Sequence, residues 1–123
     1  MSLKPLNVGQ AQILRNEGAV LVDIREPHEF NAEHIVGSLT HPLSSLPQAI
    51  DTQGHPVIFY CKSGMRTNAA AKKLSVLVNT PAYVLTGGID AWKRSGASVS
   101  GGEKSAVAGA TTFSWLLSAL RGK

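Results

Sequence analysis

The chain has 123 residues, of which 43% are hydrophobic and 16% charged, and its formal net charge is +4 at pH 7. This length suits one domain with a single core, and no apolar run approaches the roughly 18–20 residues that span a bilayer. The basic residues are few and are not interleaved with aromatic residues, so we expect no nucleic-acid partner.

Predicted strands and helices alternate along the chain. Asn7 and Gln10 have the spacing of a capping box, which predicts a helix that ends near Glu17. Residues 19–24 are apolar apart from Asp23, a pattern typical of a strand covered on both faces. The other expected elements are an edge strand over 3–6, a short helix from Pro27 with Phe30 turned inward, a turn over 34–38, a strand over 39–41, a weak helix over 43–50, a strand over 57–60, a helix over 67–78, a strand over 82–85 and a helix over 89–93.

This alternation predicts a three-layer α/β fold. We expect a mainly parallel central sheet of about five short strands with helices on both faces. In such sheets the ligand binds beyond the carboxyl ends of the strands. Cys61, the segment 23–25 and the pair Gly87 and Gly88 all lie at or beyond the carboxyl ends of predicted strands, so they are expected at that edge.

The composition changes after residue 97. Residues 98–105 have the composition of a flexible linker, and residues 113–121 have helical propensity with an apolar face. We therefore expect a domain over residues 1–97, followed by a linker and a short C-terminal helix over 98–123. Little charge flanks this helix, so we expect it to dock on the domain or mediate self-association rather than bind a membrane. The N-terminus lacks the apolar core of a signal peptide, which favours a cytoplasmic location.

Cys61 is the single cysteine, and it lies between a predicted strand and a predicted helix. Backbone N–H groups converge in such a loop, and the helix dipole is positive there. A thiol in this position ionises easily, and the thiolate is a nucleophile. With no second cysteine, an oxidised or sulfur-loaded Cys61 has to be discharged by an outside molecule.

The charges near Cys61 are basic. No acidic residue occurs between Asp51 and Asp90, whereas Lys62 and Arg66 lie within the loop. We expect these cations to lower the pKa of the thiol and to attract a small anion. The four histidines lack the spacing of metal ligands, so no metal is expected.

Four stretches of the sequence form a set of motifs: Val22–Phe30, His34–Ser38, Cys61–Thr67 and Leu85–Trp92. In their order and spacing they resemble the rhodanese domain, a sulfurtransferase, over roughly residues 6–97. In the second stretch, Val36 stands where the family usually has proline.

The resemblance implies that Cys61 takes a sulfane sulfur from a small anionic donor such as thiosulfate and holds it as a persulfide. The sulfur then passes to cyanide or a thiol, including that of a small thiol or redox protein, without a metal or organic cofactor. The substrate-binding loop would comprise Lys62, Ser63, Gly64, Met65 and Arg66. Asp23, Arg25, Gly87 and Gly88 would support it, the first two as an ion pair and the glycines by permitting close backbone approach.

Two alternatives remain open. Phosphatases that resemble this fold have a longer loop between cysteine and arginine, and the four residues between Cys61 and Arg66 favour sulfur over phosphate. Phosphatase or arsenate reductase activity is therefore the less favoured reading. The chain could also be a non-catalytic regulatory or sulfur-carrier module, although the presence of both Cys61 and Arg66 favours an enzyme.

Overall fold

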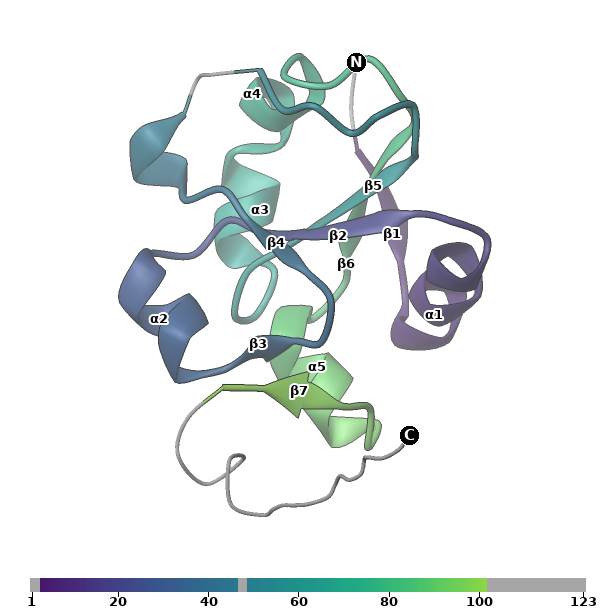
Figure 1. Ribbon diagram of the computed structural model, residues 1–123, viewed down its shortest axis with the longest axis vertical. Coiled ribbons are helices and arrows are strands. Elements are labelled where there is room, and N and C mark those ends of the chain that lie inside the picture. Colours follow the sequence, from purple (N-terminus) through teal and green to yellow (C-terminus); the bar gives the residue numbers. More distant parts are fainter. Residues whose placement is uncertain (1–2, 47–48, 102–123) are drawn as a thin grey trace.

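The computed structural model describes residues 3–46 and 49–101, which form a central parallel sheet with helices on both faces (Figure 1). The strand order is β1-β6-β5-β2-β4, and a two-stranded antiparallel sheet of β3 and β7 lies beside it. This architecture confirms the predicted fold class. The strands are β1 (Lys4–Leu6), β2 (Val20–Asp23), β3 (His34–Ile35), β4 (Leu39–Thr40), β5 (Val57–Tyr60), β6 (Ala82–Leu85) and β7 (Val99–Ser100); the helices are α1 (Val8–Asn16), α2 (Pro27–Ala32), the 3-10 turn η1 (Leu43–Ser45), α3 (Met65–Ala69), α4 (Ala71–Ser75) and α5 (Gly88–Arg94).

Local sequence explains where α1 begins. The Asn7 side chain accepts a hydrogen bond from the Gln10 N–H at 2.8 Å, and the Gln10 side chain accepts one from the Asn7 N–H at 2.9 Å. This reciprocal capping box satisfies two N–H groups that have no partner within the helix. The prediction of a capped helix is confirmed.

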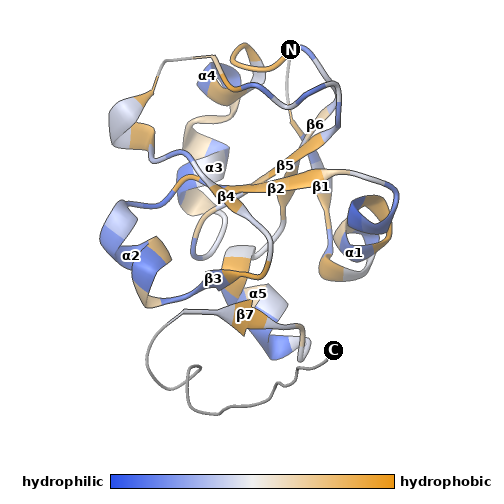
Figure 2. Ribbon diagram, in the orientation of Figure 1, coloured by the Kyte–Doolittle hydropathy of each residue, from blue (hydrophilic) through white to orange (hydrophobic). Residues whose placement is uncertain are grey.

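Each face of the sheet packs on its own hydrophobic cluster. Alternate side chains of a strand point to opposite faces, so Val57 and Phe59 pack toward α4, whereas Ile58 and Tyr60 pack toward α1 and α5. All four are fully buried. The apolar strands in the middle of the molecule are evident in Figure 2. Two-sided burial explains why β5 is continuously apolar.

Two predicted helices differ from the observed ones. The helix expected over 67–78 begins earlier, at Met65, and is interrupted at Ala70, which separates α3 from α4. Alanine is a good helix former, so nothing in the local sequence signals this interruption. The weak helix expected over 43–50 is a single 3-10 turn, η1, among the residues described there.

The aromatic side chain of Phe30 was expected in the core, but it is only half-buried. Its ring stacks on His34 with centroids 3.8 Å apart, and His34 Nδ1 lies 2.9 Å from the Phe30 carbonyl oxygen. The short helix α2 contributes no fully buried residue. Trp92, by contrast, is buried as expected.

The segment after residue 97 continues the fold for a few residues. Val99 and Ser100 were expected in a linker but form β7, which pairs with Ile35 and His34 of β3. The predicted terminal helix over 113–121 lies outside the described residues. Among residues 3–46 and 49–101, no helix has the length and apolar character needed to cross a membrane.

Candidate active site

Cys61 directly follows β5, the central strand of the sheet, at its carboxyl end. The chain turns at Gly64, whose φ of +103° favours glycine, and α3 begins at the next residue. This turn brings the Gly64 N–H to 3.1 Å from Cys61 Sγ. The Thr67 hydroxyl lies 2.9 Å from the Gly64 carbonyl oxygen and 3.7 Å from Sγ, so its single proton can be donated to either acceptor. The thiol is therefore enclosed by its own loop.

Two opposing effects act on the pKa of the Cys61 thiol. Burial, with none of the residue exposed, raises the pKa because it disfavours the charged thiolate. Hydrogen bonds from the Thr67 N–H and hydroxyl and from the N–H groups of Gly64 and Arg66 lower it. The hydrogen bonds prevail together, and the net effect lowers the pKa of Cys61 below that of an ordinary thiol. This direction agrees with the expectation of an easily ionised cysteine.

The first turn of α5 forms backbone hydrogen bonds to the cysteine loop. The Ile89 N–H donates to the Cys61 carbonyl at 2.9 Å, and the Asp90 N–H donates to the Lys62 carbonyl at 3.0 Å. These contacts need Gly88, because a Cβ built there would lie 2.4 Å from the Cys61 oxygen and 2.5 Å from the Lys62 oxygen. The close backbone approach expected at Gly88 is thus present.

Both cations of the loop are paired with carboxylates. Arg66 makes a bidentate pair with Glu29 of α2, with Nη1–Oε1 and Nη2–Oε2 distances of 2.8 and 2.9 Å. Lys62 Nζ lies 3.0 Å from an oxygen of Asp90 on α5. The hydrogen bonds from Arg66 lower the pKa of Glu29 to about 2, so this carboxylate is ionised near neutral pH. The basic surround expected from the sequence is therefore compensated by residues distant in the chain.

Asp23 and Arg25 form a buried ion pair with an Nη2–Oδ2 distance of 2.7 Å. Arg25 Nη2 also donates to the Glu33 carbonyl at 2.6 Å, and its guanidinium lies 5.9 Å from the centre of the Tyr60 ring. These contacts tie β2 to the end of α2. The pair expected from the sequence is present, and its contacts indicate a structural role.

The remaining predicted loop residues lie at the surface. Ser63 is exposed, and Met65 is 78% exposed. Sequence reasoning missed three residues of the site, Thr67, Glu29 and Asp90. Thr67 had a usable signal, since it lies three residues after Gly64 and so one helical turn along. Glu29 and Asp90 lie within the motifs Val22–Phe30 and Leu85–Trp92, but the sequence does not pair them with the loop cations, which are 37 and 28 residues away.

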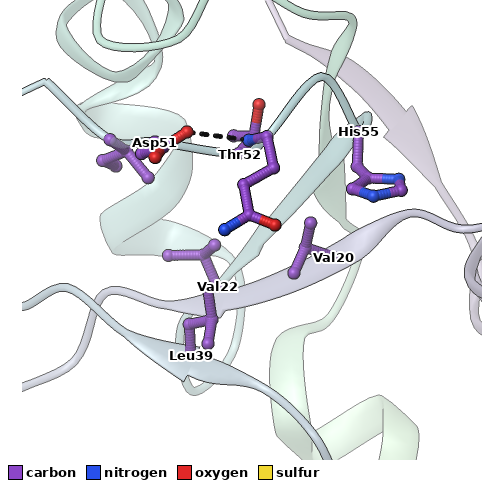
Figure 3. A pocket seen from close by; sticks show the side chains of 8 residues that line it. Val20, Val22, Leu39, Asp51, Thr52 and His55 are labelled. Carbon is purple, nitrogen blue, oxygen red and sulfur yellow. Dashed lines mark hydrogen bonds between the residues drawn. The ribbon is translucent and has the colours of Figure 1, made fainter.

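A separate pocket of about 250 Å³ lies toward the amino-terminal ends of β2 and β5 (Figure 3). It is lined by Val20, Val22, Leu39 and residues 50–53 and 55, and it includes no residue of the cysteine loop. Within the described part of the chain, no group of three or more His, Cys, Asp or Glu side chains could hold a metal ion.

The chain matches the rhodanese-like domain family over residues 8–95. It is 41% identical over 86 residues to the protein named thiosulfate sulfurtransferase GlpE from Stutzerimonas stutzeri, an alignment that covers 68% of this chain and 79% of that protein. A rhodanese-related protein from Thermoplasma volcanium has a similar structure, with a TM-score of 0.68, 25% identity, and coverage of 79% of this chain and 97% of that one. A protein from Rhodopseudomonas palustris described as a possible tyrosine phosphatase gives a TM-score of 0.66 at 28% identity, with coverage of 80% and 85%. This chain belongs to the rhodanese family.

Proposed function

We propose that this chain is a thiosulfate sulfurtransferase that carries sulfur as a persulfide on Cys61. The relative from Stutzerimonas stutzeri supports the sulfurtransferase activity. The observation that carries the mechanism is the hydrogen bond from the Gly64 N–H to Cys61 Sγ at 3.1 Å, with the Thr67 hydroxyl within 3.7 Å of the same atom; these groups stabilise a thiolate.

In the first half-reaction, the Cys61 thiolate attacks the outer sulfur of thiosulfate. A new S–S bond forms on Cys61, the bond between the two sulfur atoms of thiosulfate breaks, and sulfite leaves with the electron pair. In the second half-reaction, cyanide or a thiolate attacks the terminal sulfur of the persulfide. The Cys61 thiolate is then released, and thiocyanate or a new persulfide forms. The single cysteine makes an outside acceptor necessary.

The loop has donors for the charge that moves in these steps. The N–H groups that stabilise the thiolate can also bind the terminal sulfur of a persulfide anion, because backbone amides in a turn form an anion-binding concavity. Cys61 is fully buried, so the donor's outer sulfur reaches Sγ only when the groups that cover it move aside.

The same burial favours a second candidate, a rhodanese-fold module that regulates or binds without turnover. A buried lone cysteine that packs in a hydrophobic cluster can serve as a small apolar residue. The two candidates differ in what they require of the sulfur atom. Only the enzyme needs the thiolate.

Substitution C61S separates them. We expect the variant to fold normally and to lose thiosulfate:cyanide sulfurtransferase activity by at least about a thousandfold, because removal of a covalent nucleophile abolishes the intermediate. The assay measures thiocyanate. Activity of C61S close to that of the wild type would contradict the proposal, and lack of activity in the wild type with every donor tested would favour the module.

A further inference from the structure

We propose that Glu29 and Asp90 set the donor specificity of the site. Each carboxylate cancels the charge of a cation in the cysteine loop and so lowers the attraction for a dianionic donor such as thiosulfate, relative to a persulfide donor R–S–SH. This inference rests on the proposed sulfur transfer at Cys61.

Each cation of the cysteine loop is paired with a carboxylate from a different helix. Glu29 reaches the loop from α2 and Asp90 from α5, so two helices on different sides of the loop each supply one anion (Figure 1). Glu29 binds both terminal nitrogens of Arg66. An incoming oxyanion therefore meets a guanidinium whose fork is already occupied, and it has to use the remaining N–H groups or displace the carboxylate.

The side chains of both ion pairs are partly exposed to solvent. The side chains of Lys62 and Arg66 are 62% and 41% exposed, and those of Asp90 and Glu29 are 32% and 22% exposed. Ion pairs this exposed contribute little to stability. Charges at the rim of a site have their larger effect on the field that an approaching ion meets.

The reaction with a persulfide donor needs no cation at the rim. The Cys61 thiolate attacks the terminal sulfur of R–S–SH, the S–S bond of the donor breaks, and R–S⁻ leaves with the electron pair while the proton stays on the transferred sulfur. No dianion approaches and none departs. Neutralising the charges of Lys62 and Arg66 therefore lowers kcat/KM less for this donor than for thiosulfate.

Conservative variants test the inference. E29Q removes the charge of Glu29 but keeps an oxygen that can accept from Arg66 and from the Glu26 N–H, to which Glu29 is bonded at 3.0 Å. D90N does the same for Asp90. The matched control is E33Q, which removes one negative charge from the exposed Lys93–Glu33 pair, a pair that includes no residue of the loop.

The measurement is kcat/KM with thiosulfate and with cysteine persulfide, at low salt and at about 0.5 M salt. A unit charge about 8 Å from a dianion in water changes its binding about fivefold. We expect E29Q and D90N each to raise kcat/KM for thiosulfate about fivefold at low salt, with a smaller change for the persulfide and for E33Q. The gain should largely vanish at high salt, where the Debye length is only a few ångströms.

Three outcomes overturn the inference: an unchanged thiosulfate value, a decrease, or an equal rise with both donors. A decrease in E29Q would show that Glu29 positions Arg66 for the donor. If the wild type transfers sulfur from neither donor, the proposed function fails but the charge effect is still measured by alkylation of Cys61. The ratio of the iodoacetate to the iodoacetamide rate should then rise about twofold in E29Q and D90N, and an unchanged ratio would refute the inference.

Discussion

Gly88 offers a direct test of how the cysteine loop is supported. In Gly88→Ala the new Cβ would overlap the Cys61 and Lys62 carbonyl oxygens, at 2.4 and 2.5 Å, and these are backbone atoms that cannot rotate away. The φ of +59° adds the ordinary cost of a left-handed alanine, about 1 kcal/mol. Crowding of a tightly packed region adds about 2 kcal/mol. We therefore expect a loss of about 3 kcal/mol in the free energy of unfolding.

Gly37→Ala is the matched control, because Gly37 has a φ of +84° but open space around its Cβ position. It should lose only about 1 kcal/mol. Urea unfolding measures both losses, and thiosulfate:cyanide activity of the folded fraction shows whether the loop has moved. We expect activity to fall at least tenfold in G88A and to remain near the wild-type value in G37A. Equal stability losses with normal activity in G88A would refute the account of the support.

The other predictions concern the thiol and the buried ion pair. T67V removes the hydroxyl that helps to stabilise the thiolate, so the pKa of Cys61 should rise and its alkylation by iodoacetamide should require higher pH. T67S keeps the hydroxyl and should resemble the wild type. An unshifted pH profile of alkylation in T67V would contradict this role. D23N leaves the charge of Arg25 buried without its anionic partner and should cost about 3 kcal/mol in urea unfolding, while E33Q in an exposed pair should cost less than about 1 kcal/mol. Equal losses in the two variants would show that burial of the pair does not matter.

Much of the fold could be predicted because its signals are local. The capping box of Asn7 and Gln10 marks the start of α1, and the apolar runs of β2 and β5 reflect burial on both faces of a parallel sheet. The errors arose where tertiary context decides. No glycine or proline stands at Ala70, where the helix is interrupted, so the local sequence gives no signal of the break. Val99 lies in a segment with the composition of a linker, but it forms a strand because it pairs with β3.

In the site, too, local features could be predicted and tertiary contacts could not. The position of Cys61 could be inferred from one stretch of sequence, because the strand, the turn at Gly64 and the following helix are contiguous. The charge around it could not, since Glu29 and Asp90 become neighbours of the loop only when α2 and α5 pack beside it. A basic stretch of sequence therefore does not predict a positive electrostatic potential when folding brings carboxylates next to it.

The intact mass of the protein after incubation with thiosulfate tests the central claim most directly. A reduced sample, freed of excess donor, should gain the mass of one sulfur atom, and cyanide should remove it. C61S should gain nothing under the same conditions. A wild-type protein that gains no sulfur, or a C61S variant that gains as much, would contradict a persulfide on Cys61.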